Sequence, residues 1–147
     1  MRRLIAMIVA CGVLVAGCGK EDDMTVQERA EARAAQARAH IDDLASRVGS
    51  APQVVQDELA SCDPSTDEGL DLIYVVHLTA DDGSVERLQG EVADHFAAEG
   101  WEVERAPGDR ERRIVSVRFA KDTFTMGAEI SERTGRAVVS GSGGCVR

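Results

Sequence analysis

The chain contains few of the residues that line large apolar pockets or contact nucleic acids. Its 147 residues include three phenylalanines, one tryptophan and one tyrosine, so a large apolar pocket would be hard to build. Lysine occurs only as Lys20 and Lys121, and the formal net charge is −9. Because an acidic surface repels phosphate backbones, this charge balance argues against a nucleic-acid partner.

The apolar run near the N-terminus is too short to span a membrane. It covers residues 4–17 and is followed by charged residues at 20–23. A helix that crosses a bilayer needs about 20 apolar residues. The run follows Arg2 and Arg3 and ends in small residues, which is the pattern of an export signal. We therefore expect an export signal and not a permanent membrane span.

The end of this run resembles the lipobox of bacterial lipoproteins, since Val15, Ala16 and Gly17 directly precede Cys18. The resemblance implies that the chain is cut before Cys18, that diacylglycerol is attached to its sulfur, and that the new amino end is acylated. Each buried methylene adds about 0.8 kcal/mol to membrane affinity, so more than one acyl chain would make the anchor stable. The alternative is an ordinary secreted protein, cut near Ala16, in which Cys18 is unmodified.

The lipobox resemblance also implies a location and an organisation of the chain. Residues 1–17 would be a signal peptide and residues 18–23 a short charged tether. The protein would then lie on the outer face of the cytoplasmic membrane, or on the outer membrane of a Gram-negative cell. Its arginine- and alanine-rich composition resembles that of small lipoproteins from high-GC bacteria such as actinobacteria.

The four cysteines have separate expected fates. Cys11 leaves with the signal peptide and Cys18 carries the lipid, so Cys62 and Cys145 remain. Two thiols in an oxidising compartment are expected to form a disulfide. Closing the long loop between Cys62 and Cys145 would stabilise the fold by about 4–5 kcal/mol in the chain-entropy model. The absence of Cys-x-x-Cys spacing argues against a redox-active pair.

Two helices are expected before residue 63. Thr25 and Glu28 form a capping box before residues 26–48, and Gly49 is a plausible stop. The apolar positions of this helix recur every three or four residues: Val26, Ala30, Ala34, Ala37, Ile41, Leu44 and Val48. This thin stripe fits either a partly exposed spacer or a core helix. Residues 50–53 predict the start of a second helix that ends near Cys62.

From residue 70 onward the apolar pattern changes to a period of two, which predicts strands. A helix from Ser84 to Gly100 interrupts them. The expected strands cover residues 70–78, 101–105, 112–120, 123–131 and 136–142. The predicted order is α-α-β-α-β-β-β-β, an α+β fold with a mostly antiparallel sheet of about five strands and helices on one face. Residues 24–62 would form a helical segment and residues 63–147 the α+β domain.

Strand direction supports the disulfide. A helical crossover should make the first two strands run in the same direction, and three hairpins should then reverse the direction three times. The last strand would run opposite to the first. Cys62 precedes the first strand and Cys145 follows the last, so both should lie at one end of the sheet, with these two strands as neighbours.

No catalytic, metal or cofactor site is expected. His40, His77 and His95 show no zinc-ligand spacing, although His77 and His95 could converge if a helix packs across that face. Ser116 and Ser140 lack the Gly-x-Ser-x-Gly elbow of a nucleophile. The glycine-rich residues 140–144 lack the Gly-Lys-Ser/Thr ending of a phosphate loop, so a flexible strand end is the preferred interpretation.

Two features could contact a ligand or partner. Trp101 either covers the core or provides an aromatic contact at the sheet edge. A basic cluster flanks the turn at Pro107, and it either meets an anionic partner or headgroup or is simply a solvated hairpin. Its members are Arg105, Arg110, Arg112 and Arg113.

The secure export and anchor pattern, without a catalytic set, predicts a lipid-anchored, non-enzymatic binding module of the cell envelope. Its partner would be an envelope protein or another envelope component. The alternative is a carrier that holds a lipid or small apolar ligand between its helices and its sheet. A small envelope hydrolase is the third possibility.

Overall fold

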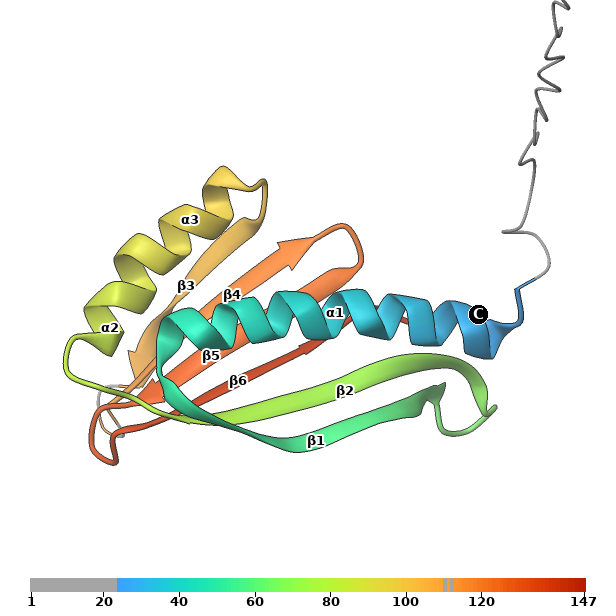
Figure 1. Ribbon diagram of the computed structural model, residues 1–147, viewed down its shortest axis with the longest axis horizontal. Helices are drawn as coiled ribbons and strands as arrows, with labels where there is room; N and C mark the ends of the chain where they lie inside the picture. The colour runs from blue at the N-terminus through green and yellow to red at the C-terminus, as the bar shows by residue number, and fades with distance from the viewer. Residues whose placement is uncertain (1–23, 110, 112) are drawn as a thin grey trace, which may run out of the picture.

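A computed structural model describes residues 24–109, 111 and 113–147, which form an α+β fold as expected (Figure 1). One long helix precedes a sheet that a short helical segment interrupts. The elements are α1 (Val26–Val48), β1 (Ser50–Asp63), β2 (Glu68–Thr79), α2 (Ser84–Arg87), the π-helical segment η1 (Leu88–Val92), α3 (Ala93–Ala98), β3 (Glu102–Asp109), β4 (Ile114–Lys121), β5 (Phe124–Ser131) and β6 (Arg136–Ser142).

The sheet has six strands in the order β1-β2-β6-β5-β4-β3, and every neighbouring pair is antiparallel. β2 and β6, the first and last of the strands expected from residue 70 onward, pair directly, with Val76 opposite Val139. The chain crosses from β2 to the far edge through α2, η1 and α3, so β2 and β3 run in the same direction without touching. The expected strand directions are therefore confirmed, while the sheet has one more strand than expected.

The additional strand is β1, and the prediction of a second helix was wrong. Residues 50–63 pair with β2, with Asp57 opposite Tyr74 and Leu59 opposite Leu72. Two register shifts near Pro52 and Val55 break the period of two, and the first nine residues of the strand are exposed. The apolar pattern therefore carried no strand signal. β1 and β2 pair with each other, so residues 50–63 belong to the same sheet as the strands that follow.

The helix α1 begins and ends where the sequence predicts. Glu28 N donates to Thr25 Oγ1 at 3.2 Å, and Thr25 N donates to Glu28 Oε2 at 2.8 Å, which completes the capping box. Gly49 follows the helix in an extended conformation. A Cβ at Gly49 would run into the Thr79 carbonyl, so the turn into β1 requires glycine for close approach.

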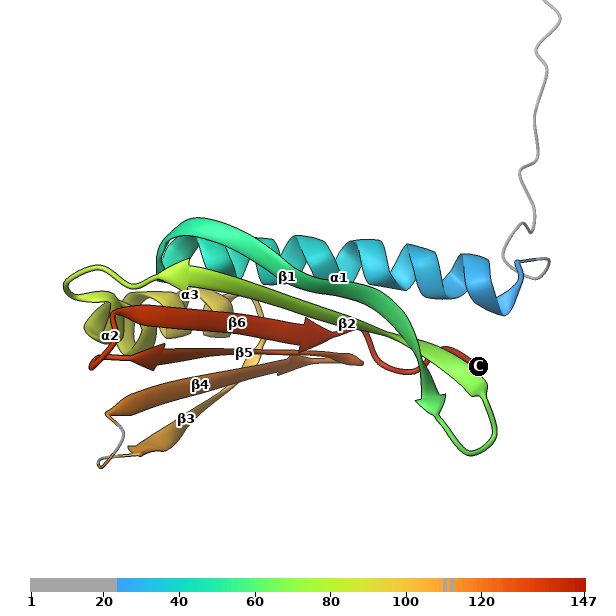
Figure 2. The same ribbon diagram turned by 90° about the horizontal axis from the view of Figure 1, so that it is seen from below.

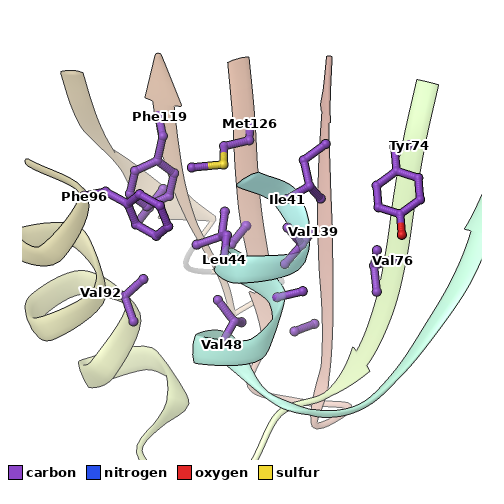
Figure 3. Close-up of a cluster of buried hydrophobic side chains, with 14 of the residues drawn as sticks. Ile41, Leu44, Val48, Tyr74, Val76, Val92, Phe96, Phe119, Met126 and Val139 are labelled. Carbon is purple, nitrogen blue, oxygen red and sulfur yellow. The ribbon is translucent and has the colours of Figure 1, made fainter. Parts of the chain in front are cut away.

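Within the described part of the chain, all helices lie on one face of the sheet and no element covers the other, which is called the bare face below (Figures 1 and 2). α1 is buried at every third or fourth position from Ala30 to Val48, so it is a core helix along its length and not a spacer. Val26 is the one residue of the expected stripe that is exposed. The layer between helices and sheet is filled by side chains such as those of Leu44, Val48, Phe96, Phe119, Ile130 and Val139 (Figure 3).

Both described ends of the chain lie at the same end of the molecule (Figure 1). Arg29 of α1 donates from Nη2 to the Arg147 carbonyl at 2.9 Å. The β1–β2 turn lies at this end too, whereas β3 ends and β4 begins at the opposite end. The molecule therefore has a terminal end and a distal end, with the sheet running between them.

Candidate functional site: the bare face and its surroundings

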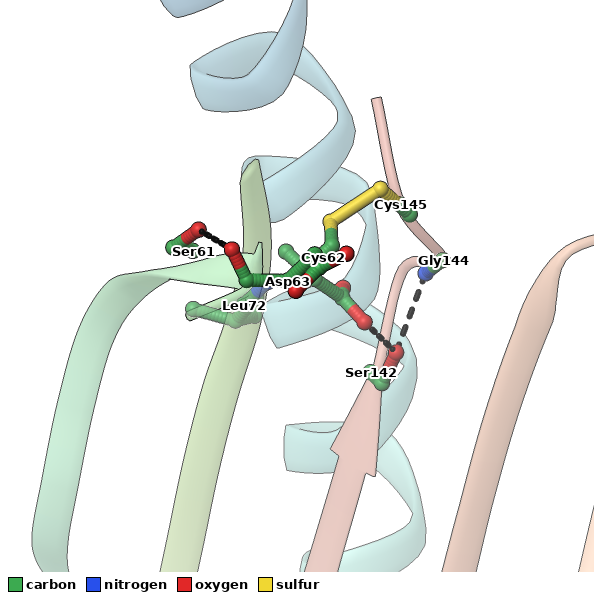
Figure 4. Close-up of a disulfide and its surroundings, with 8 residues drawn as sticks. Ser61, Cys62, Asp63, Leu72, Ser142, Gly144 and Cys145 are labelled. Carbon is green, nitrogen blue, oxygen red and sulfur yellow. Dashed lines mark hydrogen bonds between the residues drawn. A yellow bond between two sulfur atoms is a disulfide. The ribbon is translucent and has the colours of Figure 1, made fainter. Parts of the chain in front are cut away.

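A disulfide fastens the C-terminal segment to the sheet. Cys62 at the end of β1 is bonded to Cys145, with 5.9 Å between the Cα atoms, so the expected pairing is confirmed (Figure 4). Leu70 and Val146 exchange two backbone hydrogen bonds of 2.9 and 2.8 Å. Covalent and hydrogen bonds together hold this segment against β2.

The glycine-rich residues 140–144 are a packing feature beneath α1. A Cβ at Gly141 would lie 2.8 Å from Ile41 Cδ1 and 2.6 Å from the Thr125 carbonyl oxygen. A Cβ at Gly143 would lie 2.9 Å from Arg33 Cγ. These glycines let the helix approach β6 closely, which gives them a steric role in place of the expected flexibility.

Cys18 and the rest of the expected signal peptide and tether lie outside the described residues, so the lipidation stays a prediction. Among the helices of the described part of the chain, none is long and apolar enough to cross a membrane.

The expected basic cluster is only partly described, because Arg110 and Arg112 lie outside the described residues. Arg105 donates from Nη2 to Asp94 Oδ1 at 2.9 Å and from Nε to the Gln89 carbonyl at 2.8 Å. Arg113 Nε lies 3.5 Å from Glu132 Oε2. Both described arginines therefore have carboxylate partners within the chain, and a contact between this cluster and another molecule remains a prediction.

The histidines do not converge. His77 alternates with the buried Val76 and Leu78, so it lies on the bare face, whereas His95 lies among the helices on the other side. His95 Nε2 is 3.5 Å from Glu99 Oε1 and 4.0 Å from Asp43 Oδ2. No group of three or more metal-ligating side chains occurs within residues 24–109, 111 and 113–147.

Trp101 belongs to the core. It is only 5% exposed, and its ring lies edge-on to those of His40 at 5.1 Å and Phe96 at 5.9 Å. His40 in turn meets Phe124 at 5.2 Å. The aromatic contacts of Trp101 thus join α1 and α3 to the start of β3, and they favour the core interpretation over a ligand contact.

A polar cluster joins α1 to the first two strands. Tyr74 donates from its hydroxyl to Asp42 Oδ1 at 3.0 Å, and Arg38 pairs with Asp57 at 2.7 Å. Burial, followed by the hydrogen bond to Asp42, raises the pKa of Tyr74 to about 12. The cluster holds β1 beside α1, so its role is structural.

The bare face of the sheet is hollowed. A hollow of about 1040 Å³ extends from β2 to β3. The outward side chains of its lining include the aliphatic Ile73, Val75 and Val138 and the hydroxyls of Ser116, Thr125, Ser140 and Ser142. Its charged residues are Asp71, Glu102, Glu104, Glu129 and Arg118. This surface combines apolar contact area with acidic and hydroxyl groups, which suits binding of another molecule.

This surface was not predicted from the sequence, although one sequence feature indicates it. In β2 the buried Leu72, Tyr74 and Val76 alternate with Ile73 and Val75, so the strand is apolar on both faces. A strand of an antiparallel sheet with one solvated face normally carries polar residues on that face. An aliphatic pair on the bare side therefore marks a surface that another molecule could cover.

Comparison with known proteins gives no match. No protein-family model, no curated protein and no solved structure matches this chain. The function must therefore be inferred from the residues and contacts of the chain alone.

Proposed function

We propose that this protein is a lipid-anchored, non-enzymatic binding module of the cell envelope, attached to the membrane through Cys18. Its bare sheet face would bind an envelope protein or another envelope component. The observation that carries the proposal is the hollow of about 1040 Å³ on that face, lined by both aliphatic and acidic side chains.

The aliphatic residues of the hollow provide binding energy. Ile73 is 38% exposed, and its neighbour on the same face, Val75, is half-buried. Covering such side chains stabilises a complex by about 25 cal/mol for each Å² of apolar surface removed from water. The acidic groups around them would select a partner with complementary charge.

The proposed anchor places the module close to the membrane. Residues 18–25 can span at most about 25 Å when fully extended. α1 has 23 residues and is therefore about 35 Å long, and it runs from the terminal end toward the distal end. The net charge of −9 would keep the folded part off an anionic lipid surface.

The alternative functions receive less support. A lipid carrier needs apolar space between helices and sheet, but side chains no more than 5% exposed fill that layer. A hydrolase with a serine nucleophile commonly has a histidine beside it as the general base. Among the ion pairs of the described residues, those of histidine join His95 to Asp43 and Glu99, on the side of the sheet away from the hollow.

The proposal can be tested by photo-crosslinking in intact cells. A photoreactive side chain at Ser140 would lie in the hollow, and the matched control is Ser46, an exposed serine on α1. We expect a discrete crosslinked product from position 140, none from position 46, and loss of the product in the unanchored Cys18→Ala variant. Mass spectrometry of the membrane fraction should show the added lipid mass on Cys18.

Three results would contradict the proposal. An intact mass without lipid would exclude the anchor. Absence of a crosslinked product from every tested position on the sheet would exclude a binding module. Turnover of an envelope substrate that is lost on removal of one side chain would show an enzyme.

A further inference from the structure

Among the described residues, no strand pairs with the outer edge of β1, and this open edge is unusually long. β1 has 14 residues and forms one edge of the sheet. Strands are usually three to ten residues long, and an open edge offers a row of free N–H and C=O groups to another strand. The opposite edge strand, β3, has eight residues and is tied to the helical segment by Arg105. β1 is therefore the more accessible edge.

This edge carries exposed aliphatic side chains. Val54 is 50% and Val55 46% exposed, and Ile73 on the neighbouring strand is 38% exposed. The one other exposed large hydrophobic residue of the described chain is Val26. Natural edge strands are commonly protected by lysine, proline or bulges. β1 has Pro52 and two bulges in its first half, while its second half pairs in regular register with β2 and contains no lysine.

The same region is uniformly acidic. Residues 48–86 contain no lysine or arginine. The β1–β2 hairpin carries Asp57, Glu58, Asp63, Asp67, Glu68 and Asp71. Arg38 of α1 pairs with Asp57, whereas within the described residues Glu58 accepts a hydrogen bond from the amide of Gln56, at 2.6 Å, and pairs with no arginine or lysine. A second copy of the chain would bring acidic edges together, so charge complementarity favours a basic partner.

We propose that the free edge of β1 accepts an extended, lysine- or arginine-rich segment of an envelope protein as a seventh strand. This inference rests on the proposed function as a binding module and names its partner chemistry. Backbone hydrogen bonds to the edge would supply affinity, and alternate side chains would supply specificity.

The position of the added strand predicts its side-chain pattern. Glu58 lies opposite Ile73 in the β1–β2 register, so both project from the bare face. A strand beside β1 would project every second side chain from the same face as Glu58. These side chains would extend the surface that leads across Ile73 to the hollow. In the bound segment, basic and aliphatic residues should therefore occupy every second position, where their side chains project from the bare face.

The test uses the full chain in intact cells, with a photoreactive side chain at one of three positions. Val55 lies on the β1 edge, Ser140 lies in the hollow two strands away, and the matched control Val26 is an exposed valine on α1. We expect position 55 to crosslink to a lysine- or arginine-rich stretch of a partner, mapped by mass spectrometry, and position 26 not to do so.

Charge reversal makes the test specific. We expect Glu58→Lys to lower the yield of crosslinked product from position 55 by about tenfold, while Glu91→Lys, in the helical segment η1 and outside the hollow, leaves that yield unchanged. Both positions are exposed, so neither substitution should unfold the protein. A synthetic copy of the mapped stretch, added to the purified full chain, should slow amide hydrogen exchange in residues 50–63.

Four outcomes would overturn the inference. Crosslinking from Ser140 but not Val55 would show that the partner uses the hollow, so the proposed function would stand without strand addition. Crosslinking of Val55 to a second copy would show that β1 pairs with itself. A mapped stretch without lysine or arginine would exclude charge recognition. No product from either position would overturn both the inference and the proposed function.

Discussion

Gly141 determines how closely α1 can lie on the sheet. Because a Cβ there would meet Ile41 Cδ1 at 2.8 Å and the Thr125 carbonyl oxygen at 2.6 Å, Gly141→Ala should force helix and strand apart. We expect the free energy of unfolding to fall by about 1–3 kcal/mol, the usual effect of overpacking. Urea-induced unfolding of the purified variant measures the change.

Gly90 provides the matched control. It lies in the helical segment between β2 and β3, and a Cβ there would have no heavy atom within 4 Å. Gly90→Ala should therefore raise stability by about 0.5–1 kcal/mol, because alanine loses less backbone entropy in a helix. Equal losses from both substitutions would contradict the steric role assigned to Gly141.

Tyr74 is the only tyrosine, so its ionisation can be followed directly by ultraviolet absorbance. Its pKa is raised from 10.0 to about 12 by burial and by the hydrogen bond to Asp42. The fold favours the protonated hydroxyl, so this contribution to stability is complete below pH 10 and is lost as the pH rises through about 12. We expect a titration midpoint well above 10 in the folded protein. The difference in stability between the native protein and Tyr74→Phe should shrink over the same range, and a midpoint near 10 would contradict the burial.

At the scale of elements, the start of α1 depends on its capping box. Thr25→Ala should lower the free energy of unfolding by about 1 kcal/mol, because Glu28 N loses its hydrogen-bond acceptor. The hydrogen bond from the Thr25 backbone, and then that from its side chain, lower the pKa of Glu28 below its usual 4.5. The contribution of Glu28 is therefore present above pH 4.5 and lost as the pH falls through the lowered pKa. Thermal unfolding at pH 7 and pH 3 should show a smaller effect of the substitution at pH 3, and an equal effect would contradict reciprocal capping.

The contrast between α1 and β1 shows what the sequence can predict about single elements. α1 has both a capping box and a continuous buried stripe, so local chemistry and burial give the same answer. β1 is an edge strand with exposed residues over its first half, so no alternation of apolar and polar residues identifies it. Its Ser50 and Pro52 suit a helix start, but pairing with β2 outweighs that local preference.

For the whole molecule, the disulfide should supply a large share of stability. Cys62 and Cys145 are 83 residues apart, which corresponds to about 4–5 kcal/mol in the chain-entropy model. Domains have total stabilities of about 5–15 kcal/mol. We expect Cys145→Ser to lower the midpoint of urea-induced unfolding strongly. Cys62→Ser and the double variant should lower the midpoint by the same amount, because each removes the same disulfide. An oxidised protein no more stable than these variants would contradict the prediction.

The disulfide could be predicted from the sequence, but the hollow could not. Strand direction follows from counting hairpins and crossovers, and this count placed both cysteines at one end of the sheet. The hollow depends on how the five strands from β2 to β3 twist together, because residues as distant as Val75 and Glu104 line it jointly. Twist accumulates over a whole sheet and leaves no pattern within any single strand.

The central place of β6 has a consequence for the order of folding. β6 is the last of the six described strands along the chain, yet it separates β2 from β5. Until β6 is in place, the β1–β2 hairpin and the β3–β4–β5 meander are joined by no strand, and each keeps an inner edge open. Partly folded chains with open strand edges are prone to aggregate. The chain should therefore depend on chaperones until β6 closes the sheet, and truncation before β6 should leave two separate fragments of sheet that proteases can remove.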